Sequence, residues 1–241
     1  MRIPELLAPA GSIEAFLAAM DAGADACYLG LGDFNARKRA KNFSPDDLRL
    51  AAAFARSRGK NIYITLNTLI YDREIPALLD TLDHVADAGV NGIIVQDMGV
   101  LSLLRRFYPD IPIHASTQMF CHNSLHASVL ADMGVSRIIL PRELSLEEIR
   151  AIMEKVPCEY EVFVHGALCF SFSGCCLASS RLFGDSGNRG RCRQVCRFEA
   201  RSGAGKGYPF SMRDLDARPV AEELVRSEEH TSELQSRQVI S

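Results

Sequence analysis

The sequence of 241 residues predicts an α/β fold, a parallel β/α barrel of the TIM type that is truncated before its last strand. Short apolar runs alternate seven times with amphipathic segments, and this alternation is typical of a parallel sheet with crossover helices. No G-x-G-x-x-G motif follows the first run, as it would in a dinucleotide-binding sheet. Polar side chains follow most of the runs, and in a closed barrel such positions meet at one mouth.

The seven apolar runs are the predicted strands, and they lie at residues 5–8, 26–31, 61–66, 92–95, 111–114, 137–140 and 160–164. The segments between them carry helix-capping signals. Ser44 precedes a proline at the first helical position, and Ser145 with Glu148 forms a capping box. Gly89 matches a helix stop. We therefore expect one barrel domain over residues 1–225, in which no eighth strand is visible.

Residues 226–241 show neither helical nor strand periodicity, and they resemble the conceptual translation of a sequencing-adapter oligonucleotide. We expect them to be an artefactual tail and the natural protein to be longer than this chain. A barrel of seven strands then has a gap between its first and seventh strands, with unpaired backbone edges on both sides.

The composition excludes some classes of protein. Hydrophobic residues make up 47% and charged residues 24% of the chain, as in ordinary globular proteins. The formal net charge of -3 excludes a globally basic nucleic-acid binder but leaves local basic patches. No apolar run approaches the roughly 20 residues of a membrane helix, and no signal peptide is recognisable after Met1. We therefore expect a cytoplasmic protein with no membrane partner.

Five of the eight cysteines crowd into residues 169–196. In a cytosolic protein, clustered cysteines are more often metal ligands or catalytic thiols than disulfides. Residues 169–206, which we call the Cys/Arg-rich segment, also carry seven basic residues against only Asp185 and Glu199. The segment directly follows the seventh predicted strand, so we expect a Cys-rich insertion that lies over the mouth of the barrel.

Several separated motifs resemble the collagenase-like peptidase family U32, and they occur in the family's order between about residues 3 and 216. The motifs lie at residues 4–11, 34–43, 116–118, 141–144, 161–176 and 188–197. The resemblance implies a barrel-like catalytic domain. Relatives in this family hydroxylate tRNA or 23S ribosomal RNA with prephenate as the hydroxyl donor, or serve oxygen-independent ubiquinone hydroxylation. They carry, or depend on, cysteine-bound iron–sulfur clusters.

The resemblance therefore implies an iron–sulfur-dependent RNA-hydroxylating enzyme, or a subunit of one. Its expected partners are RNA (tRNA or rRNA) and prephenate, a small carboxylate co-substrate. One alternative is a collagenase-like peptidase, as the family name states. A second alternative is a subunit of ubiquinone hydroxylation, and a protein partner from the same family is also considered.

Four of the clustered cysteines are candidate metal ligands: Cys169, Cys176, Cys192 and Cys196. Four thiolates are what a 4Fe-4S cluster requires. A zinc ion bound by the same thiolates is one alternative, and free thiols or disulfides are another. In some family members the fourth cluster cysteine follows a Ser-x-Lys-Asp-Leu motif. Here the matching motif at residues 211–215 is followed by Asp216, which leaves Cys196 as the expected fourth ligand.

Polar residues at the strand ends form the candidate pocket. We expect Asn67 and Gln96 to bind substrate, and we expect His165, Arg142 and Gln118 to be catalytic. His165 can activate a nucleophile, which in a thiol protease would be a neighbouring cysteine. The alternative for His165 is a hydrogen bond to a neighbouring strand end.

Four arginines are candidates for binding anions. Arg142 and Arg37 suit a carboxylate such as prephenate, because a guanidinium pairs with a carboxylate through two hydrogen bonds. Arg189 and Arg193 belong to the basic segment, where RNA phosphates can bind. The alternatives are surface ion pairs for the first two and a solvated basic loop for the last two.

Overall fold

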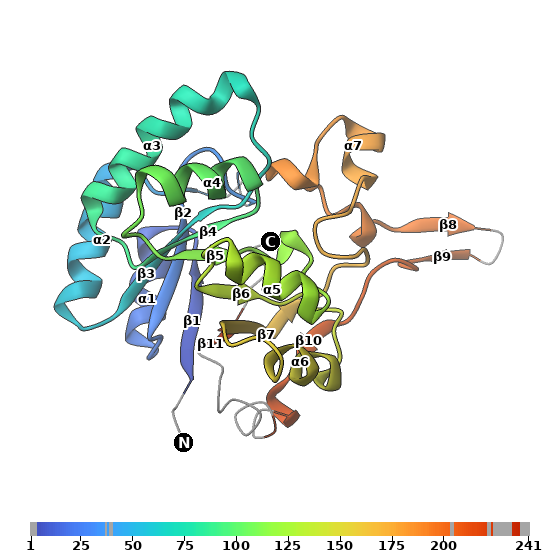
Figure 1. Cartoon of the computed structure of the whole chain (residues 1–241). Coiled ribbons are helices and arrows are strands. Elements are labelled where there is room, and N and C mark those ends of the chain that lie inside the picture. Colours follow the sequence, from blue (N-terminus) through green and yellow to red (C-terminus); the bar gives the residue numbers. More distant parts are fainter. Residues whose placement is uncertain are drawn as a thin grey trace.

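A computed structural model of the chain describes residues 4–36, 38, 41–202, 205–220, 223 and 233–236 (Figure 1). Eight parallel strands are joined side by side into a ring. In order around it they are β1 (Glu5–Ala10), β2 (Ala26–Gly30), β3 (Asn61–Leu66), β4 (Gly92–Val95), β5 (Ile113–Ala115), β6 (Arg137–Ile139), β7 (Glu159–Ala167) and β11 (Glu233–Ser236).

The predicted gap between the first and seventh strands is wrong, because β11 lies there. It pairs in parallel with β1 on one side and with β7 on the other, and β7 also pairs with β6. Sequence periodicity did not indicate this strand, because pairing with two open backbone edges needs only a few extended residues and no apolar pattern. The interpretation of residues 226–241 as an adapter-derived tail stays a prediction.

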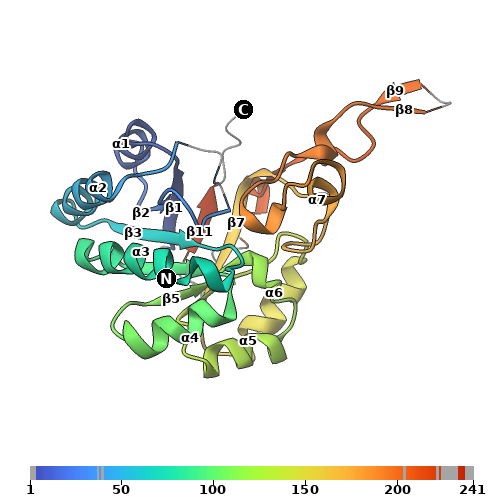
Figure 2. The ribbon, with the colours of Figure 1, turned by 90° about the horizontal axis from the view of Figure 1, so that it is seen from above.

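Six helices cover the outside of the ring (Figure 2). They are α1 (Ile13–Asp21), α2 (Pro45–Ser57), α3 (Ile75–Ala88), α4 (Met98–Phe107), α5 (Ser124–Asp132) and α6 (Leu146–Met153). The predicted caps are confirmed: Ser44 caps α2, Ser145 and Glu148 form the capping box of α6, and Gly89 ends α3 in the left-handed conformation. None of the described helices is long and apolar enough to cross a bilayer.

Alternate residues of each strand face opposite sides of the ring. On β3, Ile62 and Ile64 belong to the large apolar cluster that also contains buried side chains of the helices. Tyr63 belongs to a second cluster, which consists of strand residues only: Leu7, Ala26, Tyr28, Tyr63, Ile94 and Ile139, with Phe163 packed against them. The second cluster therefore fills the interior of the ring, as the side-chain layers of a β/α barrel do.

Part of the chain that follows β7, with α7, β8 and β9, projects away from the ring (Figures 1 and 2). These elements are α7 (Ala178–Phe183) and the antiparallel hairpin of β8 (Ala200–Ser202) and β9 (Gly205–Gly207). The chain then returns to the ring, where β10 (Asp214–Asp216) pairs antiparallel with the end of β7. Short 3-10 turns complete the described elements at Asp72–Glu74, Thr117–Met119, Gly187–Arg189, Val195–Arg197 and Arg218–Val220.

Candidate functional site at the barrel mouth

The Cys/Arg-rich segment docks on loops that follow the carboxyl ends of β2, β3, β5 and β6. Two glycines permit the closest approaches. A Cβ atom at Gly190 would lie 2.1 Å from the carbonyl oxygen of Asn35, after β2. A Cβ atom at Gly174 would lie 2.4 Å from the carbonyl oxygen of Gln118, after β5. Both glycines also have positive φ, so no other residue fits these contacts without strain.

Arg189 fastens the segment to the loop after β3. Its guanidinium donates hydrogen bonds to both carboxylate oxygens of Glu74 and, at 2.6 Å, to the carbonyl oxygen of Leu69. It also lies over the ring of Tyr71, 4.1 Å from the centroid. The hydrogen bond from Arg189 is the largest of the causes that lower the pKa of Glu74. This arginine is therefore an anchor between segment and barrel in the structure.

A second anchor joins the segment to the loops after β5 and β6. The carboxylate of Glu143 accepts hydrogen bonds from the backbone N–H of Ser173 at 2.8 Å and from its hydroxyl at 3.0 Å. The same carboxylate lies 3.1 Å from Nε2 of His122, whose Nδ1 lies 2.8 Å from the carbonyl oxygen of Phe120. Both ring nitrogens thus face acceptors, so satisfying both contacts requires a proton on each nitrogen or on Glu143.

Three of the strand-end residues expected to form the pocket are Asn67, Gln96 and Gln118, which follow β3, β4 and β5. Asn67 accepts a hydrogen bond from the backbone N–H of Ala36 at 2.8 Å. Gln96 is 8% exposed, and its Oε1 atom has no hydrogen-bond partner within the described chain. Gln118 makes the close backbone contact with the segment. The substrate-binding and catalytic roles assigned to them stay predictions.

Two other expected catalytic residues lie near the end of β7. Arg142 stacks over the ring of Phe163, 4.9 Å from the centroid, and donates to the carbonyl oxygen of Ala167 at 3.3 Å. His165 is exposed and is paired in register with Asp216 of β10. The carboxylate role of Arg142 and the catalytic role of His165 stay predictions.

The other expected anion-binding arginines differ in how far the structure describes them. Arg37 lies outside the described residues. Arg193 forms an ion pair with Asp185, and its guanidinium lies 4.8 Å from the centroid of the Phe183 ring. Arg189 is engaged by Glu74. Contacts of Arg189 and Arg193 with RNA would have to compete with these internal ion pairs. The RNA-binding roles of both arginines stay predictions.

The four candidate cysteine ligands lie on one segment but do not form an assembled metal site. Among the described residues, no group of three or more His, Cys, Asp or Glu side chains is arranged to hold a metal ion. Burial raises the pKa of Cys196, and the neighbouring Cys169 and Cys192 raise it further while Arg197 opposes them. A Cβ atom at Gly187 would lie 3.8 Å from both the Cys176 carbonyl oxygen and the Cys192 Cβ.

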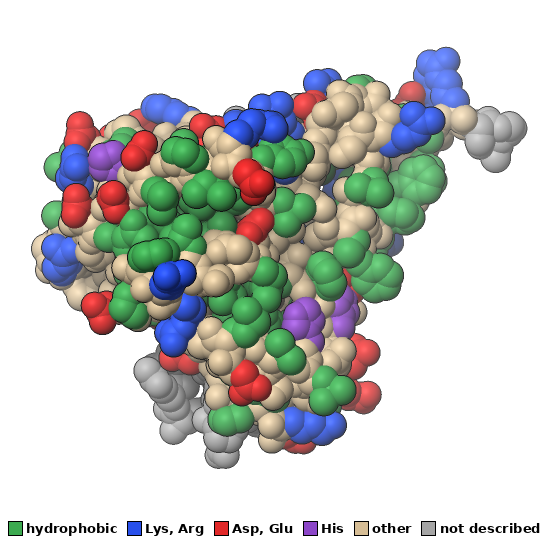
Figure 3. All heavy atoms as spheres, turned by 45° about the horizontal axis from the view of Figure 1, so that its top comes forward, with side chains coloured by type: hydrophobic (Ala, Val, Ile, Leu, Met, Phe, Trp, Pro, Cys, Tyr) green, Lys and Arg blue, Asp and Glu red, His purple; other side chains and the backbone are tan. Residues whose placement is uncertain are grey.

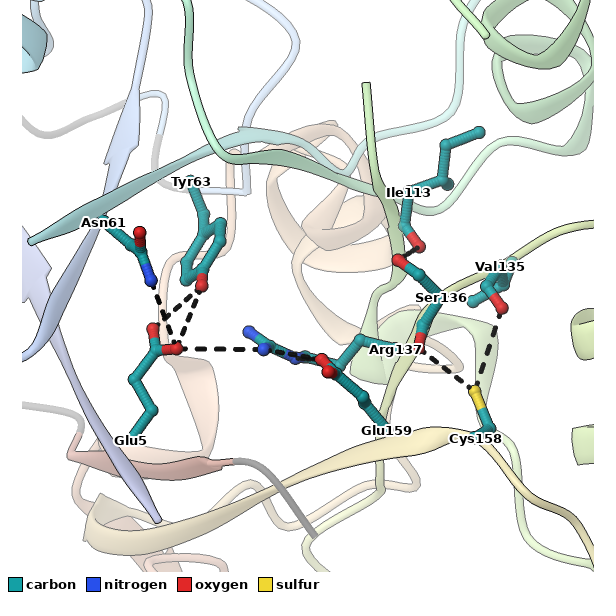
Figure 4. Close-up of polar contacts among 9 residues, drawn as sticks. All are labelled: Glu5, Asn61, Tyr63, Ile113, Val135, Ser136, Arg137, Cys158 and Glu159. Carbon is teal, nitrogen blue, oxygen red and sulfur yellow. Dashed lines mark hydrogen bonds and ion pairs between the residues drawn. The ribbon is translucent and has the colours of Figure 1, made fainter. Parts of the chain in front are cut away.

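A polar cluster fills the opposite, amino-terminal end of the ring (Figure 4). Glu5 accepts hydrogen bonds from the hydroxyl of Tyr63 at 2.8 Å and from the side-chain amide of Asn61 at 3.4 Å. Arg137 lies 3.8 Å from Glu5 and donates to Glu159 at 2.7 and 3.0 Å. These residues begin, or lie close to the beginning of, their strands, and that end of a β/α barrel is associated with stability.

His114 extends this cluster into the barrel interior. Its ring packs against Tyr63 with centroids 4.7 Å apart, and its Nδ1 atom has no hydrogen-bond partner within the described chain. Burial, and secondarily the charge of Arg137, lower the pKa of His114 well below its usual value. The imidazole is therefore neutral at pH 7.

A hollow of about 480 Å³ lies at the same end, between α5 and the start of β7, and not at the mouth. It is lined by Ala131, Val135, Ser136, Pro157, Cys158 and Glu159. Burial raises the pKa of the Cys158 thiol to about 11. This thiol is therefore protonated at neutral pH and is not a reactive nucleophile.

Sequence reasoning missed two groups, the Glu143–Ser173–His122 anchor and the amino-terminal polar cluster. The alternation of inward and outward residues could have identified the second group, because Glu5, Tyr63, His114 and Arg137 all occupy inward positions of predicted strands. No local signal identifies the first group, because Glu143 and Ser173 are 30 residues apart.

Comparison with known proteins identifies the family to which the sequence is similar. The model of peptidase family U32 matches residues 11–237. Two relatives from Escherichia coli are the "tRNA hydroxylation protein P", 38% identical over 84% of this chain, and the "23S rRNA 5-hydroxycytidine C2501 synthase", 39% identical over 91%. The "Collagenase" of Porphyromonas gingivalis is 35% identical over 80% of the chain. The chain spans only 45%, 31% and 49% of these relatives' respective lengths.

A solved structure agrees with the fold. The U32 peptidase Mk0906 superposes with a TM-score of 0.69, covering 100% of this chain and 94% of that one at 16% sequence identity. At this identity the likeness concerns the fold, which is an α/β fold with a strongly curled and mostly parallel sheet. The family match extends over nearly the whole chain, and three relatives exceed 30% identity. The chain therefore belongs to peptidase family U32.

Proposed function

We propose that this chain is part of an enzyme that hydroxylates tRNA or ribosomal RNA, with a 4Fe-4S cluster as cofactor and prephenate as hydroxyl donor. Two relatives of similar identity carry RNA hydroxylation in their names. The observation that carries the proposal is the anchoring of the cysteine segment to loops at the carboxyl ends of the strands, where β/α barrels build their sites.

The donor chemistry of the segment suits the cofactor. Cys169, Cys176, Cys192 and Cys196 would hold the cluster through their thiolates. The backbone N–H of Gln194 already lies 3.4 Å from the Cys192 sulfur. When bound, a cluster supplies redox and Lewis-acid chemistry at the mouth. Binding of metal and ordering of the ligands are coupled processes, so the ligands need not be assembled beforehand.

Residues of the chain supply substrate binding at the mouth. Arg142 offers a planar guanidinium for a carboxylate such as that of prephenate, and its stacking on Phe163 fixes the plane of the group. The His122 ring nitrogen and the Glu143 carboxylate lie 3.1 Å apart, within hydrogen-bond reach, which makes them a candidate pair for proton transfer.

The test is anaerobic reconstitution of the chain with iron and sulfide, followed by incubation with prephenate and RNA. We expect about four iron atoms per chain and charge-transfer absorbance, together with hydroxylated nucleosides detected by mass spectrometry. Replacing Cys192 by serine should reduce bound iron sharply, whereas Cys158→Ser, remote from the segment, should not. If the reconstituted chain contains zinc and no iron, a zinc site bound by the same cysteines would take the place of the proposed 4Fe-4S cluster.

Peptide hydrolysis is the second candidate, and the name of the Porphyromonas gingivalis relative favours it. The same reconstituted and metal-free preparations should therefore be offered a collagen-like peptide. Cleavage that survives removal of iron, without RNA modification, would make peptidase activity the better assignment. RNA modification without cleavage would retain the first proposal.

A further inference from the structure

The projecting chain carries an unusual surface of exposed rings and unpaired arginines, which we call the aromatic–basic surface. Figure 3 shows hydrophobic and Lys or Arg side chains gathered along the projection. Its rings are Phe170, Phe172, Phe183, Phe198, Tyr208 and Phe210, and its charges are Arg181, Arg191, Arg201 and Arg213.

The rings of this surface are exposed to a degree that is rare for aromatic residues. Each is between 42% and 65% exposed. They are six of the nine exposed aromatic side chains in the described chain, the other three being Tyr71, Phe107 and Phe120. Large exposed apolar groups that cluster in this way mark binding surfaces, whereas scattered single ones do not.

The rings are ordered in edge-to-face contacts. Phe170 and Phe210 have centroids 5.1 Å apart, and Phe183 and Phe198 have centroids 6.0 Å apart. Phe172 lies 5.8 Å from the ring of His122, at the barrel mouth. In an edge-to-face pair, the ring that presents its edge keeps both faces uncovered by its partner. The surface therefore offers ring faces on which a flat group can stack.

Basic residues outnumber acidic ones on the projecting chain, which also exposes the carboxylates of Glu199 and Asp214. Arg181, Arg191, Arg201 and Arg213 are exposed, and none of them forms an ion pair within the described residues. The other cations of the segment differ, because Arg189, Arg193, Arg197 and Lys206 already pair with carboxylates of the chain. Four exposed guanidiniums that form no ion pair within the described residues favour an anionic partner.

We propose that the aromatic–basic surface binds single-stranded RNA, with bases stacked on its rings and phosphates near its arginines. Single strands expose base faces, and sequence-tolerant binding by stacking combined with basic side chains is the usual mode of single-strand recognition. Because Phe172 touches His122 at the mouth, a strand held here would pass beside the site. This inference rests on the proposed action on RNA and adds the binding mode and the residues.

The test is fluorescence anisotropy with a labelled single-stranded RNA and with its duplex, using this chain. Phe172→Ala and Phe210→Ala should each weaken single-strand binding about 5- to 150-fold, as expected for the loss of one stacked base. Phe107→Ala is the matched control, because Phe107 ends α4 outside the projection and is 62% exposed, against 65% for Phe172. Phe172→Trp, which retains a stacking face, should preserve binding, and binding should weaken as salt rises.

Several outcomes would overturn the inference. They are unchanged affinity in both alanine variants, duplex bound as tightly as single strand, or no binding by the parent chain. Concentration-dependent self-association that the same variants abolish would identify a protein interface instead. Hydroxylation is measured separately on reconstituted chain. If the reconstituted chain hydroxylates RNA but the alanine variants bind RNA as the parent does, the proposed surface is rejected and the proposed reaction is retained. If the variants lose RNA binding but no hydroxylated product forms, the proposed reaction is rejected and the surface is retained.

Discussion

The strand ring buries apolar side chains on both of its faces, whereas the Cys/Arg-rich segment exposes aromatic rings and is held to the ring by a few polar anchors. Apolar burial is spread over many residues, so no single apolar contact determines the stability of the ring. The position of the segment depends on Arg189, Glu143 and two close glycine contacts. The difference indicates that the segment can open without unfolding the ring.

The largest effect expected from a single change lies in the ring, at Arg137. Arg137→Ala removes the charge between Glu5 and Glu159 and leaves Glu5 in a mostly buried site. We expect a loss of about 3 kcal/mol in the free energy of unfolding, as for a broken buried ion pair. Arg150→Ala is the control, because its ion pair with Glu223 is exposed and should contribute less than about 1 kcal/mol. Equal urea midpoints for the two variants would contradict the assignment.

The second prediction separates the segment from the ring. Gly190→Ala places a methyl group against the Asn35 carbonyl, so the segment should leave the barrel there. Gly184→Ala is the control, since Gly184 also has positive φ, at 71°, but its Cβ would meet nothing within 4 Å. Trypsin should cleave the segment of Gly190→Ala at least about tenfold faster than that of Gly184→Ala. If the ring and the segment of Gly190→Ala unfold together in one thermal transition, the segment does not open independently of the ring.

The two regions also differ in how far the sequence predicts them. The alternation of apolar runs located all seven strands before the segment, and local caps such as Ser44 located helix starts, because these signals lie within a few residues of each other. The position of β11 depends on two strand edges far away in the chain. The contact between Arg189 and Glu74 spans 115 residues. Such long-range contacts leave no periodic trace in the sequence, so the contacts that hold the segment on the barrel were not predicted.

The third prediction uses pH to test the interior of the ring. The pKa of His114 is lowered in the folded chain, so the unfolded chain binds a proton here that the folded chain does not. The stabilisation from neutral His114 is present above the unfolded value of about 6.5 and is lost as pH falls below it toward the folded pKa. His114→Gln should reduce the pH dependence of unfolding by about 1.4 kcal/mol per pH unit between roughly pH 6.5 and 5. Identical slopes for parent and variant would show that His114 is protonated in the folded chain.

The smallest expected effect concerns one hydrogen bond of the segment's second anchor. Ser173 is 2% exposed and gives Glu143 two hydrogen bonds, one from its backbone and one from its hydroxyl. Ser173→Ala removes only the second, so local opening should become easier by about 1 kcal/mol while global unfolding is unchanged. Ser171→Ala is the matched control, because that hydroxyl donates only to the backbone of its neighbour Phe172, at 3.3 Å. Amide exchange across residues 169–176 should quicken about fivefold in Ser173→Ala alone. Equal exchange in both variants would mean that the backbone hydrogen bond by itself keeps the segment on Glu143.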